Sequence, residues 1–447
     1  MYSFNSLATI PLLFSVCSAI ELEDSTSSYK SAAGTAAYGL MSLYVGNQSG
    51  QTVGIFPDPI YWWEAGAAWN AMIDYWYYTG DTTYNNEVSA ALLAQIGTND
   101  DYMPANQTLT EGNDDHGFWG LAAMNAAEKN FPNPPSDEPG WLALAQAVFN
   151  KFVSRWDTSV CDGGLRWQIY TWNKGYDYKN SISQGVFFHL GARLARYTGN
   201  TTYAEWAEKI YDWTSDIGFI TSDGVIYDGA QTEENCTGIT EIQWTYNSAM
   251  FIVGSAYLYN FTTEEKWKDR LDLIWGNAVN VFFENNIVYE QACEPYETCD
   301  VDDYSFKGYL VAYLGYSAAV YPDFMNTVLP YLKASAAGAA QACVGGTAGT
   351  TCGMSWLDKG YDGLTGVGQE MSALNALLSP LSKIVTAPLT SDTGGTSKGD
   401  ASAGEGNSDD DDLYEIKPAT VKDKVAASIL TVFISMGSVS LCVFLAL

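Results

Sequence analysis

Two adjacent aspartates, Asp114 and Asp115, stand where an apolar helix is expected to begin. At the start of a helix, the positive end of the backbone dipole favours one carboxylate as an anion. Repulsion between the two neighbours, together with partial burial, disfavours the ionisation of both. One charged and one protonated carboxyl group form the pair that glycosidic cleavage requires. The alternative is a solvated helix cap with a neighbouring acid, and these two residues alone do not exclude it.

Aromatic side chains lie close in sequence to carboxyl and amide groups in several other segments. The chain has 15 Trp, 30 Tyr and 18 Phe, more than a core alone needs. An aromatic face beside a hydrogen-bonding group suits a sugar. The candidate sugar-binding residues are Asn113, Trp63, Trp119, Asp177, Trp244 and Tyr246. Helix packing is the alternative for the tryptophans, and spacing along the chain does not decide between retention and inversion of the anomeric carbon.

The overall composition narrows the classes of partner. Of the 447 residues, 47% are hydrophobic, which is enough for one large domain or two ordinary ones with a substantial core. The chain has 52 acidic and 21 basic residues, a formal net charge of −31. Because binding nucleic acid depends on neutralising phosphates with Lys and Arg, this balance argues against a nucleic-acid partner. A neutral ligand rich in hydroxyl groups fits better.

A recurring unit indicates the elements that position these side chains. Residues 78–84, Tyr-Thr-Gly-Asp-Thr-Thr-Tyr, return at 197–203 as Tyr-Thr-Gly-Asn-Thr-Thr-Tyr, and a looser copy spans 259–267. Each copy joins two apolar segments with helical spacing. Gly80 and Gly199 stand where a helix would end in a left-handed residue, and the polar cluster after them can cap the next helix. The pattern predicts repeated helical hairpins.

These hairpins predict one all-α domain over residues 20–380, arranged as a closed ring of helix pairs because no polar capping repeats are found. Two similar extended segments, 219–228 and 282–290, predict short turn-and-strand loops at one end of the ring. From 381 to 424 the composition changes to Ser, Thr, Gly and Asp, which is typical of an unstructured stalk.

The cysteines favour disulfides in an oxidising compartment. Six of the eight lie outside the terminal segments, and six allow 15 pairings. Two pairs close short loops rich in turn residues, and the third follows by elimination. The favoured pairs are Cys161 with Cys236, Cys293 with Cys299, and Cys343 with Cys352. A metal site is the alternative, but with only His116 and His189 and no Cys-x-x-Cys spacing we expect none, and both histidines are interpreted as structural.

The two ends of the chain predict export and anchoring. Residues 1–19 carry a short apolar run followed by small residues, as a secretory signal peptide does, although no Lys or Arg precedes the run. Residues 425–447 are uncharged and mostly apolar, which favours a glycosylphosphatidylinositol (GPI) signal with attachment near 404–408; a single membrane-spanning helix is the alternative. The expected N-glycosylation acceptors are Asn47, Asn106, Asn200, Asn235 and Asn260.

Taken together, these blocks resemble the fungal cell-wall mannosidases of glycoside hydrolase family 76, the defective-cell-wall group. The resemblance covers nearly the whole predicted mature domain and keeps the order of its blocks. The similar stretches are 61–64, 111–115, 133–135, 141–149, 163–170, 175–180, 192–200, 243–247 and 369–374.

The resemblance implies an (α/α)6 barrel that cleaves α-mannosides with retention and without a cofactor. On the matching positions, Asp114 would be the nucleophile and Asp115 the general acid/base. The implied substrate is α-1,6-mannan or the mannose core of a GPI glycan, with cell-wall glucan as an acceptor in a transfer that links GPI proteins to the wall. The implied location is the outer face of the plasma membrane and the wall, with the enzyme held by its lipid anchor; we expect a monomer.

Two other classes of protein fit the same residues. A wall-bound lectin or adhesin would keep the sugar-binding cleft and lack turnover. A structural wall protein would use the aromatic side chains for packing only and would not bind sugar.

Overall fold

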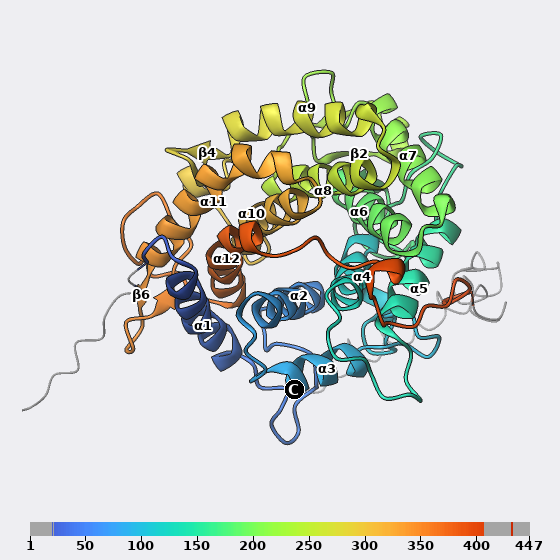
Figure 1. Ribbon diagram of the computed structural model, residues 1–447. Helices are drawn as coiled ribbons and strands as arrows, with labels where there is room; N and C mark the ends of the chain where they lie inside the picture. The colour runs from blue at the N-terminus through green and yellow to red at the C-terminus, as the bar shows by residue number, and fades with distance from the viewer. Residues whose placement is uncertain (1–19, 21, 406–430, 432–447) are drawn as a thin grey trace, which may run out of the picture. The chain divides into compact units, whose positions relative to one another are not determined.

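Twelve helices form two concentric rings in the computed structural model, which describes residues 20, 22–405 and 431 (Figure 1). The inner ring consists of α2 (Trp62–Thr79), α4 (Asn113–Glu128), α6 (Ser181–Thr198), α8 (Thr245–Thr262), α10 (Asp303–Val320) and α12 (Val367–Leu378). The outer ring consists of α1 (Thr26–Ser42), α3 (Asn85–Ala94), α5 (Trp141–Ser154), α7 (Thr201–Asp216), α9 (Glu265–Val281) and α11 (Pro322–Ala342). Each inner helix contacts the next, and α12 contacts α2, so the inner ring closes. The predicted (α/α)6 barrel is confirmed.

The two rings differ in how their helices are buried. In α4, Asp115 is the one residue that is not buried, so this helix is enclosed on all sides. The outer helix α7 buries one face, with Tyr203, Ala207 and Ile210 at helical spacing. Small residues let the inner helices approach closely: a Cβ added to Gly66 on α2 would lie 2.9 Å from the Trp119 ring of α4.

The predicted helix ends are confirmed at the repeated unit. Gly80 follows α2 with φ of 80°, and Gly199 follows α6 with φ of 71°. The looser third copy ends in the same manner, because Thr263 follows α8 with φ of 59°. In all three, the left-handed residue ends an inner helix, and the chain turns outward into the outer helix that follows it.

Short strands and 3-10 turns occupy the connections between helices. The strands β1 (Tyr178–Asn180), β2 (Gly229–Gln231) and β3 (Ile239–Thr240) form an antiparallel sheet in that order, and two hairpins pair β4 (Phe283–Glu284) with β5 (Ile287–Val288) and β6 (Cys343–Gly345) with β7 (Thr351–Cys352). The 3-10 turns are η1 (Thr108–Thr110), η2 (Thr232–Glu234), η3 (Glu294–Tyr296), η4 (Ser379–Ile384) and η5 (Ser391–Thr393). The second expected turn-and-strand segment is the β4–β5 hairpin, and the first contains the isolated bridge between Ile220 and Ile226.

Residues 385–405, here called the C-terminal strap, lie against the barrel. The Leu389 N–H donates to the carbonyl of Glu128 at the end of α4. The Asn130 amide donates to the Gly394 carbonyl and accepts from the Thr396 N–H, and the Asn150 amide of α5 donates to two carbonyls near the end of the strap. The strap therefore runs from the C-terminal end of α4 along the outside of α5 (Figure 1, orange-red).

The strap also caps α5. No side chain of the preceding loop caps this helix, whose first N–H groups would lack acceptors. The Leu142 N–H instead donates to Ser397 Oγ at 2.9 Å, and the Ala143 N–H donates to the Lys398 carbonyl at 3.2 Å. The compact unit consequently extends to Glu405, beyond the predicted boundary at 380, and the described part of the predicted stalk is packed.

All three predicted disulfides are present. They join Cys161 to Cys236, Cys293 to Cys299, and Cys343 to Cys352. Within the described residues, one group has the spacing of metal ligands, made of Asp303 and the two cysteines of the middle pair, and there both sulfurs are already bonded to each other.

The predicted signal peptide, the GPI tail and most of the attachment region lie outside the described residues, and in the described part of the chain no helix is long and apolar enough to cross a membrane. The five predicted glycosylation acceptors are all exposed. Asn260 differs from the others because it lies within α8, where its amide donates to the Val320 carbonyl and accepts from Arg196. In the folded chain both ends of the Asn260 amide are therefore already hydrogen-bonded.

Candidate active site

A pocket of about 590 Å³ opens where the N-terminal ends of the inner helices converge. Five of the six inner helices, α2, α4, α6, α8 and α10, bring to it residues from their first turn or from just before it. Its lining residues are Tyr61, Trp62, Trp63, Gln107, Thr110, Glu111, Asp114, Asp115, Phe118, Trp167, Gln168, Tyr178, Asn180, Asp228, Trp244, Tyr246, Asp300, Asp302, Asp303 and Phe306. Helix N-termini carry partial positive charge, so this end of the barrel favours acids.

Asp114 and Asp115 occupy the first turn of α4, as predicted. The Gly112 N–H donates to Asp115 Oδ2 at 2.7 Å, and the Asp115 N–H donates to Asp114 Oδ1 at 3.1 Å. Asp114 is buried and Asp115 is half-buried, and both line the pocket. The alternative of a solvated cap is therefore wrong.

Burial raises the pKa of both carboxyl groups. The pKa of Asp115 rises to about 6, held there by the Gly112 N–H, which favours the charged form. The pKa of Asp114 rises well above its usual range, first because of burial and then because of the charge on Asp115, although the backbone N–H groups of Asp115 and of Asp114 itself, and then the Trp167 side chain, oppose the shift. The pair thus keeps one proton near neutral pH. These contacts place the negative charge on Asp115 first, the reverse of the order in the predicted roles.

The side chains beneath the pair form a fixed support. The Arg155 guanidinium donates to Asn113 Oδ1 and to His116 Nδ1, both at 3.2 Å. Since a guanidinium only donates, His116 Nδ1 accepts, and its Nε2–H donates to the Asp101 carbonyl. Burial lowers the pKa of His116 well below its usual range, so the ring is neutral. Asn113 also donates to the Arg166 carbonyl, which ties α4 to the loop beside the pocket.

One wall of the pocket is aromatic. Tyr246 stacks on Phe306 with ring centroids 3.8 Å apart, and Trp63 lies 4.6 Å from the Phe118 ring. The indole N–H of Trp63 donates to Asp302 Oδ1 at 3.0 Å, which fixes the position of both side chains. Such a wall offers apolar faces with a hydrogen-bonding group at the edge, the combination a sugar ring needs.

The pocket is also lined by a group of acidic side chains. Seven carboxyl side chains line the pocket, and no lysine or arginine in the described part of the chain does so. Burial raises the pKa of Asp302 to about 7 and that of Asp303 to about 6, with the charge of Asp300 adding to both shifts. Asp228 is held by the hydroxyl of Tyr178 at 2.7 Å. The pocket can therefore hold neutral hydroxyl groups or a cation, and it disfavours anions.

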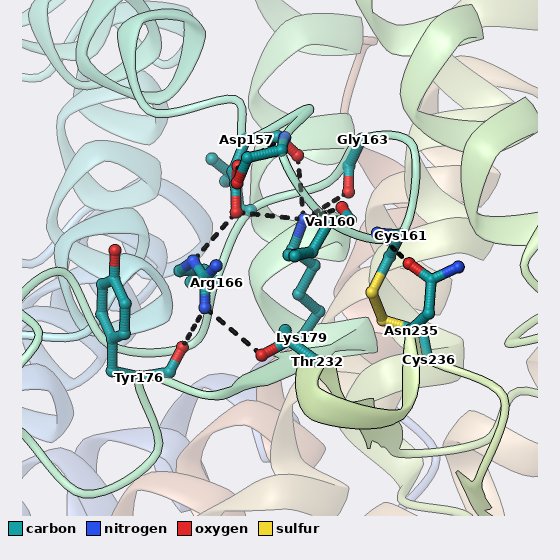
Figure 2. A network of polar contacts seen from close by, with 12 residues as sticks. Asp157, Val160, Cys161, Gly163, Arg166, Tyr176, Lys179, Thr232, Asn235 and Cys236 are labelled. Atoms are coloured by element: carbon teal, nitrogen blue, oxygen red, sulfur yellow. Dashed lines mark hydrogen bonds and ion pairs between the residues drawn. A yellow bond between two sulfur atoms is a disulfide. The ribbon is translucent and has the colours of Figure 1, made fainter.

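A buried lysine supports the remaining wall (Figure 2). The ammonium group of Lys179 donates to the carbonyls of Asp157, Val160 and Gly163 at 2.9, 2.9 and 2.6 Å. Asp157 lies 3.4 Å from the same ammonium group and accepts from Arg166 Nε at 2.9 Å. Burial lowers the pKa of Lys179 to about 8. Lys179 thereby binds its strand to the loop that leads into the pocket wall.

The alternation of strand β1 explains this arrangement. Tyr178 and Asn180 are two residues apart, so they share one face of the strand and both line the pocket. Lys179 lies between them and points to the other face, toward the loop closed by the disulfide (Figure 2).

Three of the six predicted sugar-binding residues line the pocket with the aspartates: Trp63, Trp244 and Tyr246. The other three do not. Asn113 lies beneath the pair, between Arg155 and Arg166. Trp119 is fully buried and stacks on Trp62, because it lies one residue beyond the face of α4 that carries Phe118. Asp177 is exposed, just outside β1.

Sequence reasoning missed the acids at the start of α10. Asp300, Asp302 and Asp303 follow a disulfide loop and belong to no repeated unit, so nothing local distinguishes them from a solvated acidic turn. The signal available was their position at a helix start, the same signal that identified the pair on α4. Glu111 and Asp228 were also missed as lining residues.

A closed ring of paired helices with an acid-rich, aromatic-walled pocket at its inner N-terminal ends defines a helical-barrel glycoside hydrolase. Residues 28–392 match the model of glycosyl hydrolase family 76. The mannan endo-1,6-alpha-mannosidase DCW1 of Saccharomyces cerevisiae is 48% identical over 430 residues, which cover 96% of this chain and 95% of that protein. The chain belongs to glycosyl hydrolase family 76.

Other relatives agree. The mannan endo-1,6-alpha-mannosidase DFG5 of S. cerevisiae is 45% identical over 399 residues, covering 89% of this chain and 87% of that one. The crystal structure of Dfg5 from Chaetomium thermophilum in complex with glucosamine has a TM-score of 0.85 and 43% identity, covering 88% and 99% of the two chains. An inactive variant of an α-1,6-mannanase from Salegentibacter, with two consecutive aspartates replaced and α-1,6-mannotetrose bound, shares the fold at 18% identity and a TM-score of 0.65, covering 79% and 98%.

Proposed function

We propose that this glycoside hydrolase is an endo-α-1,6-mannosidase that also transfers mannosyl chains to sugar acceptors. The observation that carries the proposal is the pair Asp114 and Asp115, two adjacent carboxyl groups in the first turn of α4 that both line a pocket walled by aromatic rings, where burial raises the pKa of each. Relatives more than 40% identical over most of their length are named for that activity. In the bacterial mannanase, replacement of two consecutive aspartates gives an inactive protein.

The proposed reaction proceeds with retention. Asp114 attacks the anomeric carbon of a mannosyl residue while Asp115 gives its proton to the leaving oxygen, and a glycosyl ester forms on Asp114. Asp115, now charged, takes a proton from water or from a sugar hydroxyl, whose oxygen displaces Asp114. The first step needs the shared proton on Asp115, whereas the Gly112 N–H favours charge there. Substrate binding therefore has to move the proton from Asp114 to Asp115.

The acids of the pocket support a GPI glycan as donor. A sugar with a free amine would place a cation among Asp300, Asp302 and Asp303, where no protein cation of the described chain lines the pocket. The related Dfg5 structure is a complex with glucosamine. We infer that the enzyme cleaves the mannose core of such a glycan and passes the attached protein to cell-wall glucan. A lipid anchor at the outer face of the plasma membrane would place it beside both polymers.

Product analysis tests the proposal. The purified protein is incubated with an α-1,6-mannan oligosaccharide and, separately, with a GPI-core glycan. Each incubation is run with and without a glucan acceptor, and the masses of the products are measured by mass spectrometry. Shortened mannan supports hydrolysis, and a donor–acceptor adduct supports transfer. Binding without new reducing ends or adducts would establish the lectin instead. A variant with both Asp114→Asn and Asp115→Asn is the matched control for contaminating activity.

A further inference from the structure

The predicted glycosylation site at Asn235 shares a residue with a disulfide. The acceptor sequence is Asn235-Cys236-Thr237, and Cys236 is bonded to Cys161. None of the other four acceptor sequences contains a cysteine. We propose that Asn235 accepts a glycan only before the Cys161–Cys236 disulfide forms, so that disulfide formation closes this acceptor to the glycosyltransferase.

In the oxidised fold this segment is fixed by hydrogen bonds. Asn235 Oδ1 accepts from the Cys161 N–H at 2.8 Å, and the Asn235 N–H donates to the Thr232 carbonyl at 2.9 Å. Asn235 and Cys236 both have left-handed backbones, with φ of 49° and 58°. The Thr237 hydroxyl donates to the Glu234 carbonyl at 2.8 Å.

A glycosyltransferase has to bind the asparagine amide and the hydroxyl two residues later at the same time, which needs a segment free to change its backbone. The disulfide prevents this because Cys236 lies between the two groups and is almost completely buried. Trp213 donates to the Cys161 carbonyl at 2.9 Å and packs with the disulfide, and Lys179 holds the same loop through the carbonyls of Val160 and Gly163.

The finished glycan is nevertheless compatible with the fold. Asn235 is exposed, and its amide nitrogen points away from the disulfide while its oxygen faces Cys161 (Figure 2). A sugar on the nitrogen leaves the hydrogen bond from Cys161 intact. A chain glycosylated first can therefore still form the disulfide, whereas a chain oxidised first stays unmodified, and the protein is made in two forms.

The two steps are the transfer of a glycan to Asn235 and the oxidation of two thiols. In the first, the Asn235 amide nitrogen bonds to the anomeric carbon of a lipid diphosphate-linked oligosaccharide. The bond from that carbon to the phosphate oxygen breaks, one amide proton is lost and the lipid diphosphate leaves. In the second, the thiols of Cys161 and Cys236 give two protons and two electrons to a disulfide-bearing oxidant, which becomes a dithiol.

The two steps take place in the same period. Cys161 precedes Asn235 by 74 positions in the chain, so its thiol is available as soon as Cys236 is made. Synthesis at about 5–20 residues per second leaves the rest of the chain incomplete for tens of seconds. Disulfide formation takes seconds to hours depending on the oxidant. A change in oxidant supply should therefore change the outcome.

The experiment measures glycan occupancy on newly made full-length chains in a secreting eukaryotic cell, by mass spectrometry after enzymatic removal of the glycans in heavy-oxygen water. The readout does not require the chain to fold. We compare the wild type, with and without a brief pulse of dithiothreitol, with Cys161→Ser, which keeps the acceptor sequence and removes the disulfide. Cys299→Ser, which removes a different disulfide, controls for slow folding, and Asn47 and Asn106 serve as acceptors without a cysteine.

The proposal expects partial occupancy of Asn235 in the wild type, a severalfold rise with dithiothreitol and in Cys161→Ser, and no rise in Cys299→Ser. Occupancy of Asn47 and Asn106 should stay constant. Equal occupancy of Asn235 in the wild type and Cys161→Ser overturns the proposal. A rise of the same size in Cys299→Ser also overturns it, because slow folding alone would then be the cause. If all acceptors are empty, the proposed secretion fails as well.

Discussion

The two ends of the inner ring differ in whether their acidic side chains are paired with cations. At the N-terminal ends, seven carboxyl groups line the pocket without a lysine or arginine from the described chain. At the C-terminal ends, Glu128 is buried against Arg193 at 2.8 Å, and Asp74 is buried against Lys129. The cations of the second region lie where the helix dipoles are negative, and the acids of the first lie where they are positive.

The difference shows which end stabilises the barrel and which is available for chemistry. A buried acid with a fixed cation is neutralised in the free protein. An acid that is buried without a cation beside it has a raised pKa and can still exchange a proton or bind a ligand. The strap reinforces this contrast, because it covers the paired end and leaves the pocket open.

The largest effect is expected from Asp114→Asn and Asp115→Asn. Loss of the nucleophile should lower kcat/KM by on the order of 10⁴-fold or more for every donor. Loss of the acid/base should cost about 10²–10⁴-fold with mannan but little with a donor whose leaving group needs no proton. Kinetics with mannan and with an activated aryl mannoside check this. If Asp114→Asn is the variant that retains activity on the activated donor, the two roles are exchanged. Asp115, which has the lower pKa, would then be the nucleophile, and Asp114 would be the general acid/base.

At the paired end, Glu128→Gln should destabilise the fold by about 3–5 kcal/mol, because Arg193 is left buried without its counter-ion. Denaturant unfolding measures this. Glu208→Gln, which removes one partner of the exposed pair with Lys266, is the matched control and should cost about 0–1 kcal/mol. Equal losses in the two variants would refute the contrast between the ends.

Ending the chain at residue 384, just before the strap, should lower stability by on the order of 2–4 kcal/mol, since Leu142 and Ala143 lose the acceptors that cap α5. A chain that ends at 405 keeps them and is the control. Thermal unfolding of the two chains gives the comparison, and coincident melting curves would show that the strap contributes nothing.

Asp302→Asn should stabilise the protein at pH 8 by on the order of 1 kcal/mol while weakening substrate binding. The pKa of Asp302 is raised to about 7 in the fold, against about 4 when unfolded. The unfolded chain therefore releases its proton first, and wild-type stability falls as the pH rises from about 4 to about 7. Asn retains an acceptor for the Trp63 indole. The free energy of unfolding, measured at pH 4.5 and at pH 8, should differ less between the two pH values in the variant than in the wild type. An equal difference in the two proteins would mean that Asp302 does not cause the pH dependence.

The smallest effect is expected from Asp177→Ala. This carboxyl group lies outside the pocket lining, so kcat/KM should change by less than about twofold. Initial rates on mannan suffice as the measurement. A large loss of rate would put Asp177 among the sugar-binding residues after all.

Local features were predictable from the sequence because their causes are local. Gly80 and Gly199 end helices through their own backbone freedom, and the two short-loop disulfides close between neighbours. Asp114 and Asp115 were found from their position at a helix start. These predictions needed no knowledge of the rest of the chain.

Features that depend on packing between distant segments were harder to predict. The strap has the composition of a stalk, and its contacts use backbone groups and hydroxyls that leave no apolar pattern. Trp119 and Asp177 were assigned to the site because their segments mix aromatic rings with carboxyl groups, and each adjoins a residue that does line the pocket. In a helix or strand, one step along the chain turns a side chain to another face, and a sequence alone does not say which face meets the pocket.

The cap on α5 also bears on the order of folding. This helix belongs to the first half of the chain, yet Leu142 depends on Ser397, 255 positions further on. The contact of α1 with α12 likewise joins the two ends of the barrel. Contacts between residues so far apart in sequence form late, because closing the long loop between them costs conformational entropy. The early hairpins should accordingly remain loosely held, with exchangeable amide hydrogens, until the final residues of the domain reach them.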